Sequence, residues 1–208
     1  AALHGEYFAA LTKFVCDGLD ACGYSYCTGG IMATNPQWQL TLSQWKGLFT
    51  QWISRPDPEA LLHCSIFFDL DGVWGREQWA AELRRHIATQ AKDNGKFLAA
   101  LARNALSRTP PLGFFKAFVM EKDGRHNNTI NLKRRGTAPL TDVIGVHALA
   151  VGSRARNSFE RLDDIIDTQL LPEGKAQDLR DALEYLSIVR VRHQANDVNQ
   201  ELPSDNNI

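Results

Sequence analysis

The fold of this chain depends most on the stretch Ser65-Ile66-Phe67-Phe68-Asp69-Leu70-Asp71-Gly72, an apolar run that ends in two carboxylates and a glycine. The run predicts a short buried β-strand. Because side chains at positions i and i+2 of a strand project from the same face, Asp69 and Asp71 are expected to point together at its carboxyl end. Ligand sites of open α/β sheets lie at that edge. The two carboxylates are therefore a candidate site, either for Mg²⁺ or for a nucleophile and an acid with separated pKa values.

Composition limits the class of protein. The chain has 208 residues, enough for one large domain or two small ones, and 44% of them are hydrophobic, which is enough for a core. A net charge of −1 disfavours nucleic acid and anionic membranes as partners. The sequence contains no secretory leader and no apolar run that could span a bilayer, so a cytoplasmic protein is expected. Since the chain begins directly on an amphipathic helix, we expect it to be part of a longer protein.

The cysteines give no sign of a metal site or of a disulfide framework. None belongs to a C-x-x-C pair, and no histidine lies at zinc-ligand spacing from them. Free and mostly buried thiols are expected at all four positions, which are Cys16, Cys22, Cys27 and Cys64.

Helical periodicity recurs along most of the chain, and it predicts an α+β protein that is predominantly helical. Thr41 is a suitable N-cap, and Asp57 with Pro58 is a typical helix start. The spacing of apolar residues predicts helices over 5–22, 41–53, 59–63, 77–91, 96–106, 139–150, 157–168 and 174–199.

Other segments predict strands and a boundary. We expect a strand over 24–34, bent at Gly29-Gly30, and a β-hairpin formed by 114–121 and 128–133 through Asp123-Gly124. The clearest break is the run Thr109-Pro110-Pro111-Leu112-Gly113. It predicts two domains, 1–108 and 109–208.

Several motifs, taken in order, resemble one family. They are Gly29-Gly30 to Trp38, Ser65 to Asp69, Pro110 to Phe115, Asn131-Leu132-Lys133 to Asp142, and Arg190-Val191-Arg192-His193-Gln194. Together they resemble the nucleotidyltransferases found beside CBS and cyclic-nucleotide-binding domains in bacterial signalling proteins, which are related to the PII uridylyltransferases. The resemblance covers nearly the whole chain. It implies the C-terminal part of a polymerase-β-like nucleotidyltransferase domain, followed by a helical bundle that binds substrate.

The resemblance also implies an activity and its partners. Such enzymes transfer UMP or AMP from an Mg²⁺-bound nucleoside triphosphate to a protein or small-molecule acceptor. Upstream CBS or cyclic-nucleotide-binding domains and a homodimer are further expectations. Neither the Gly-Ser turn nor the Asp-x-Asp pair of these enzymes is found in the place that the resemblance requires, and the only Gly-Ser, Gly152-Ser153, follows a helix in the second domain. The main metal ligands are therefore expected upstream of Ala1, and this fragment is expected to be inactive by itself.

Particular residues follow from the same resemblance. It implies a cleft between Asp69 and the segment 133–142, with Asp69 as the catalytic residue and a metal contact. The implied contacts to nucleotide or substrate come from Gly29, Gly30, Asn35, Asp71, Lys133, Arg134 and Asp142. A plain structural role remains open for Asp142, which lies near a helix N-terminus. His193 is expected to bridge two helices rather than to act as a base.

Two other functions stay open. The family has arginine and proline where this chain has Asp71 and Gly72, and the reversed charge favours a regulatory or dimerisation module without catalysis. Asp69 and Asp71 also resemble the first motif of the haloacid dehalogenase phosphatases. That fold needs the motif on its first strand and a later acidic pair at a strand end, whereas Asp163-Asp164 falls within a helical segment.

Overall fold

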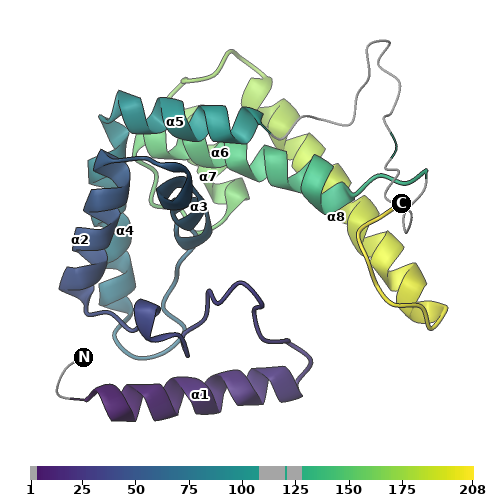
Figure 1. Ribbon diagram of the computed structural model, residues 1–208. Helices are drawn as coiled ribbons and strands as arrows, with labels where there is room; N and C mark the ends of the chain where they lie inside the picture. Colours follow the sequence, from purple (N-terminus) through teal and green to yellow (C-terminus); the bar gives the residue numbers. More distant parts are fainter. Residues whose placement is uncertain (1–3, 108–119, 121–127) are drawn as a thin grey trace. The chain divides into compact units, whose positions relative to one another are not determined.

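The computed structural model describes residues 4–107, 120 and 128–208 (Figure 1). The described residues are predominantly helical, as predicted, and none of them belongs to a strand. Eight α-helices and two short helical turns follow one another as α1 (Gly5–Ala21), η1 (Pro36–Trp38), α2 (Leu42–Ser54), α3 (Pro58–Phe67), α4 (Glu77–Lys92), α5 (Gly95–Leu106), η2 (Lys133–Thr137), α6 (Ala138–Val151), α7 (Ser158–Asp167) and α8 (Lys175–Asn199). The chain divides into two compact units, Ala1–Gln51 and Trp52–Ile208.

The first unit contains α1, η1 and most of α2. The predicted strand over 24–34 is wrong, because this segment forms turns. Its geometry depends on Gly30, whose φ of +70° is in the left-handed region that favours glycine. The Gly30 carbonyl oxygen accepts hydrogen bonds from Asn35 Nδ2 (3.0 Å) and from Trp38 Nε1 (3.1 Å). Asn35 also caps η1, since its Oδ1 accepts from the backbone N–H of Gln37 (3.0 Å).

Helix α2 begins where its sequence predicts. The backbone N–H of Gln44 donates to Thr41 Oγ1 (3.3 Å), and the N–H of Thr41 donates to Gln44 Oε1 (2.9 Å). This reciprocal capping box satisfies two backbone donors that a helix start otherwise leaves unpaired.

Helix α3 is the main departure from the sequence prediction. Asp57 Oδ1 accepts from the N–H of Ala60 (2.8 Å) and Pro58 is the first helical residue, as expected. The helix then continues through Ser65 and Ile66 to Phe67, where a strand was predicted. Once the cap has nucleated a helix, adding residues costs less than starting another element, and no strand of the described residues offers a partner. Asp69 therefore lies in the loop that follows a helix.

Helix α6 is the centre of the second unit and packs against α4, α5, α7 and α8. Ile144 and Ala148 on α6 meet Leu162 and Ile165 on α7 in a core where Leu162 and Ile165 are fully buried. Helix α5 begins at an Asn94 cap, whose Oδ1 accepts from the N–H of Phe97 (3.0 Å). Its predicted separation from α4 is confirmed.

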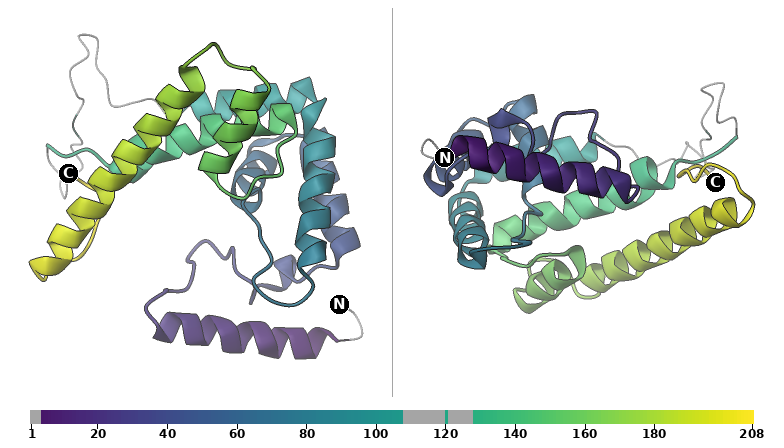
Figure 2. Two further views of the ribbon diagram at one scale, coloured as in Figure 1. Left: turned by 180° about the vertical axis from the view of Figure 1, so that it is seen from behind. Right: turned by 90° about the horizontal axis from the view of Figure 1, so that it is seen from below.

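The segment before η2 pairs with the C-terminal residues. Ile130 N–H donates to the Ile208 carbonyl (2.8 Å), Ile208 N–H donates back to Ile130 (3.1 Å), and Leu132 N–H donates to the Asn206 carbonyl (2.8 Å). The segment 128–133, predicted as one strand of a hairpin, contains only a short antiparallel bridge between Asn131 and Asn207. The expected partner, 114–121, lies outside the described residues except for position 120, and so does the break at 109–113. Figure 2 shows the tail after α8 running back along that helix.

Two further points complete the fold. The tryptophans differ in burial: Trp38 and Trp52 are buried, whereas Trp74 is 87% exposed and Trp79 is 52% exposed. Among the described residues, no helix combines the length and the apolar character that crossing a bilayer requires.

Candidate functional site

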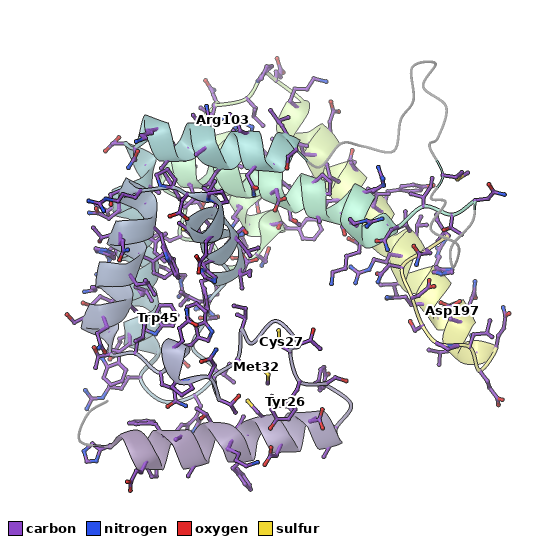
Figure 3. The ribbon with its side chains drawn as sticks, in the orientation of Figure 1. Tyr26, Cys27, Met32, Trp45, Arg103 and Asp197 are labelled. Atoms are coloured by element: carbon purple, nitrogen blue, oxygen red, sulfur yellow. The ribbon has the colours of Figure 1, made fainter. Side chains whose placement is uncertain are left out.

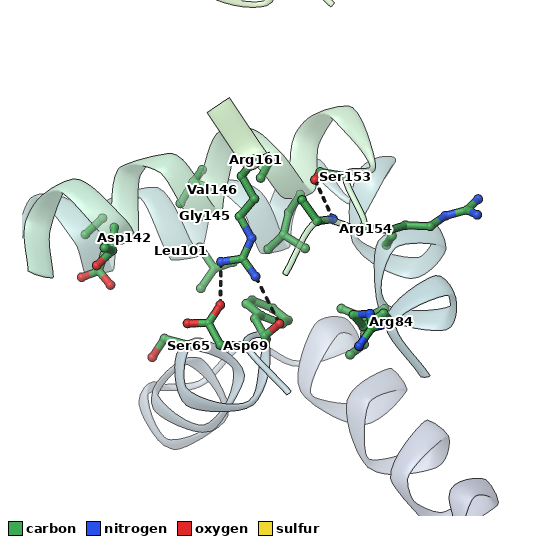
Figure 4. A pocket seen from close by; sticks show the side chains of 18 of the residues that line it. Ser65, Asp69, Arg84, Leu101, Asp142, Gly145, Val146, Ser153, Arg154 and Arg161 are labelled. Carbon is green, nitrogen blue, oxygen red and sulfur yellow. Dashed lines mark hydrogen bonds and ion pairs between the residues drawn. The ribbon is translucent and has the colours of Figure 1, made fainter. Parts of the chain in front are cut away.

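A cavity of about 100 Å³ lies within the second unit (Figure 4). Its walls come from the end of α3, from α4, α5 and α6, and from the start of α7 with the loop before it. Pockets that enclose a whole drug-sized ligand have about 300–1,000 Å³, so this cavity suits one small group of a larger ligand. Its polar and charged lining residues are Ser65, Asp69, Arg84, Asn104, Thr141, Asp142, Ser153, Arg154 and Arg161.

Asp69 is held at the cavity by Arg161 of α7. Arg161 Nη1 lies 2.6 Å from Asp69 Oδ1, and Arg161 Nη2 donates to the carbonyl of Phe68 (3.3 Å). Only 12% of the Arg161 side chain is exposed, whereas 63% of the Asp69 side chain is exposed. A nearly buried guanidinium thus fixes the loop after α3, and Figure 4 shows it reaching across the cavity to Asp69.

Asp71 lies between two arginines and is not among the residues that line the cavity, although one of its partners, Arg84, is. Its Oδ1 accepts from Arg84 Nη1 (2.7 Å), and its Oδ2 lies 3.1 Å from Arg156 Nη1. The Arg84 hydrogen bond, assisted by the N–H of Gly72 and by the charge of Arg156, holds the pKa of the Asp71 carboxyl below its usual value. The Arg84 side chain is only 11% exposed. Asp69 and Asp71 together neutralise Arg161 and Arg84, which line the cavity, and Asp71 also pairs with Arg156.

The structure brings together part of the cleft that the sequence predicts. Asp69 and Asp142 line one cavity although they come from separate parts of the chain, and Thr141 lies beside them. One carboxylate oxygen of Asp142 is shielded from solvent. Lys133 and Arg134 are exposed in η2 and are not among the residues that line the cavity.

The remaining predicted residues lie in the first unit. Gly29 and Gly30 were expected to present backbone amides to a phosphate. The N–H of Gly30 instead donates to the Cys27 carbonyl (3.1 Å), and the Asn35 side chain bonds within the same turn. These contacts give Gly30 and Asn35 a structural role in the turn. Whether Gly29, Gly30 and Asn35 also contact a ligand stays a prediction.

The carboxylates of Asp69 and Asp71 do not fit a Mg²⁺ site in this arrangement. Mg²⁺ needs carboxylate oxygens that are free to approach at about 2.0–2.1 Å. Asp69 and Asp71 are each paired with arginine, whose positive charge repels a cation. Among the described residues, no group of three potential ligand atoms occurs at the cavity.

The arginines of this site are not among the residues that the sequence motifs single out. Arg84 and Arg161 lie close to buried apolar residues of their own helices. Arg84 lies three residues before Ile87, and Arg161 directly precedes Leu162. An arginine within an apolar helical stripe is a signal of this kind of site, because buried charges are retained only when paired. Ser153 was noted only to exclude a triphosphate turn. It bonds to Asp164 (2.5 Å) and shapes the loop that carries Arg154.

Comparison with known families gives two matches. Residues 95–208 match the family described as "putative nucleotidyltransferase substrate binding domain", and residues 1–59 match the family described as "putative nucleotidyltransferase". Neither the curated proteins nor the solved structures gave a match to the chain. The cavity wall formed by α5, α6 and α7 lies within the first matched range, whereas Asp69, Asp71 and Arg84 lie between the two.

Proposed function

The chain belongs to the family of nucleotidyltransferase substrate binding domains, which matches more than half of its length, and we propose that its cavity binds an anionic group of a substrate of nucleotidyl transfer. The two family matches confirm the family that the sequence motifs predict. The substrate, the metal and the biological setting belong to the proposal.

The pair of nearly buried arginines at the cavity is the observation that carries this proposal. Arg84 and Arg161 both line the cavity with side chains only 11% and 12% exposed, and they hold the carboxylates of Asp71 and Asp69 in the loop after α3. Guanidinium groups recognise carboxylate and phosphate with the same planar set of donors. Since the carboxylates belong to an exposed loop, a substrate phosphate or carboxylate can replace them without burying a new unpaired charge.

The reaction that we propose follows from the family resemblance. The chain contributes the substrate-binding part of an enzyme that transfers UMP or AMP from an Mg²⁺-bound nucleoside triphosphate to a protein or small-molecule acceptor. We place this activity in bacterial signalling, with CBS or cyclic-nucleotide-binding domains as partners. The cavity suits one anionic end of the substrate, so the rest of the substrate lies outside it. Residues elsewhere supply the metal ligands, because Asp69 and Asp71 are already paired.

Calorimetric titration of the chain with UTP, ATP and inorganic phosphate tests this proposal. We expect saturable binding of at least one of them. Arg161→Gln or Arg84→Gln should weaken the binding by about tenfold or more, since each removes a charged donor from a shielded site. Arg103→Gln is the matched control, because Arg103 is exposed on α5 and does not line the cavity (Figure 3). The absence of binding, or equal binding by all four proteins, would contradict the proposal.

A regulatory module without catalysis is the second candidate function, and the pairing of Asp71 supports it. Asp71 neutralises Arg84 and Arg156 from within the chain, where the family has an arginine. The variant Asp71→Arg distinguishes the two functions. Stronger phosphate binding in this variant would support a substrate site that Asp71 restrains, whereas unchanged binding would favour the regulatory module.

The phosphatase alternative loses its structural basis. Its nucleophile and acid must project from the end of a strand, whereas Asp69 and Asp71 lie in a loop that follows α3. Asp163 and Asp164 lie on helix α7, as the sequence predicts, and therefore cannot form the acidic strand end of that fold.

A further inference from the structure

A second group of polar side chains lies where α8 meets the C-terminal tail. His193 and Asp197 are one helical turn apart near the end of α8, where Figure 3 labels Asp197. Asp205 comes from the tail that follows this helix and contacts His193. None of the three lines the cavity described above. The site is therefore independent of the proposed function.

The separations within this group match those of ligands around one metal ion. His193 Nε2 lies 3.2 Å from Asp205 Oδ1 and 3.4 Å from Asp197 Oδ2, and the three ligand atoms all lie within 4.8 Å of one another. In a tetrahedral zinc site with bonds of about 2.0–2.1 Å, neighbouring ligand atoms are about 3.3 Å apart. Little movement is therefore needed to bring all three into contact with one ion.

The number of protons that His193 can share with the two carboxylates also favours a cation at this site. Two carboxylates face one ring nitrogen, and His193 Nε2 can carry only one proton. A single N–H cannot point fully at both oxygens, whereas one divalent ion can contact both carboxylates and the ring nitrogen together. Two carboxylates and a neutral imidazole also balance the charge of such an ion.

Backbone contacts hold the carboxylates in place. The N–H of Asp205 donates to Asp197 Oδ2 (3.3 Å), and the N–H of Asn207 donates to Asp205 Oδ1 (2.8 Å). Arg190 Nε donates to Asn206 Oδ1 (2.6 Å), which ties the tail to α8. Outer contacts of this kind orient metal ligands and raise their affinity.

We infer that His193, Asp197 and Asp205 form a binding site for one divalent transition-metal ion, with Zn²⁺ as the ion that this donor set fits. Imidazole and carboxylate are ordinary Zn²⁺ ligands, and Mg²⁺ prefers oxygen donors alone. The side chains are 25%, 14% and 40% exposed, in the same order, which leaves room for a water molecule as the fourth ligand.

Such an ion would link two segments of the second unit, which are α8 and the C-terminal tail. The tail that carries Asp205 pairs with 130–132, and this segment leads directly into η2 and α6. Binding to the folded state alone stabilises it. Zn²⁺ is therefore expected to raise the Tm of the chain, and Mg²⁺ at the same concentration is not.

Zinc titration of the chelator-treated chain, by calorimetry and by thermal unfolding, tests this inference. We expect one Zn²⁺ per chain and an increase in Tm. His193→Gln, Asp197→Asn and Asp205→Asn should each weaken the binding by about tenfold or more. Asp167→Asn is the matched control, because it removes an exposed carboxylate from α7.

Two controls keep the inference open to refutation if a variant fails to fold. The double variant Cys22→Ser with Cys27→Ser removes the exposed thiols and should bind Zn²⁺ as the wild type does. X-ray absorption at the zinc edge of the wild-type chain should show nitrogen and oxygen ligands. Sulfur ligands, the absence of saturable binding, or unchanged binding in all three ligand variants would overturn the inference.

Discussion

Asp71 makes the stability of the fold depend on pH. The pKa of Asp71 lies below its usual value of 3.8, mainly because of the hydrogen bond from Arg84. The Gly72 N–H and, after it, the charge of Arg156 lower the pKa further. Because the folded-state pKa lies below the unfolded value, the carboxylate stabilises the fold at higher pH, and the contribution is lost as the pH falls below 3.8.

The variant Asp71→Asn tests this coupling. At pH 7 we expect its Tm to be a few degrees below that of the wild type, since the ion pairs with Arg84 and Arg156 are weakened. The difference should shrink once the pH falls below 3.8, and thermal unfolding across that range measures it. A difference that is independent of pH would show that packing, rather than charge, explains the effect.

The cysteines give a second prediction at this scale. Burial raises the pKa of the Cys64 thiol to about 12, whereas Cys22 and Cys27 are exposed. Because the thiolate is the reactive form, iodoacetamide at pH 8 should modify Cys22 and Cys27 in the folded chain and leave Cys64 unmodified. Peptide mass spectrometry locates the label. Equal labelling of Cys64 and Cys22 without denaturant would contradict the fold around α3.

At the scale of elements, the turn between α6 and α7 places the residues of the cavity. Gly152 ends α6 with a φ of +75°, and Ser153 and Arg154 follow it at the cavity. A Cβ at Gly152 would also meet the Lys92 side chain at 3.1 Å. Gly152→Ala should therefore lower the free energy of unfolding by about 1–2 kcal/mol.

Gly145→Ala is the matched control within the same helix. Gly145 lies inside α6, and a Cβ there would meet nothing within 4 Å. Alanine favours the helix interior, so this change should raise the free energy of unfolding by about 0.5–1 kcal/mol. Urea unfolding measures both variants. Changes of the same sign would contradict the conformation assigned to Gly152.

Elements differ in how well the sequence predicts them. The starts of α2 and α3 follow from side chains that bond to nearby backbone groups, so a few residues carry the whole signal. The run Ser65–Phe68 has no such signal, because a short apolar stretch fits a buried helix as well as a buried strand. The cap at Asp57 and the absence of a strand partner among the described residues decide for the helix.

At the scale of the whole molecule, stability of the second unit rests on the core between α6, α7 and α8. Leu162 is fully buried there with Ile144 and Ile165. Leu162→Ala should lower the free energy of unfolding by about 2–5 kcal/mol, because it removes buried apolar surface and leaves a cavity. Urea unfolding followed by circular dichroism gives the value.

Leu106→Ala is the control for that prediction. Leu106 is 72% exposed at the end of α5, so its loss should change the free energy of unfolding by less than about 0.5 kcal/mol. Comparable losses in the two variants would mean that α6, α7 and α8 do not form the core of this unit.

The sequence by itself determined the helical character, most helix boundaries and the family, because periodicity, caps and ordered motifs are local properties of the chain. It also singled out Asp69 and Asp142. Only the tertiary structure decided that these two residues line one cavity with Arg84 and Arg161, and that His193 meets Asp205 in the tail. The physical reason is that an ion pair or a ligand set joins residues distant in sequence, and their encounter depends on how the helices pack.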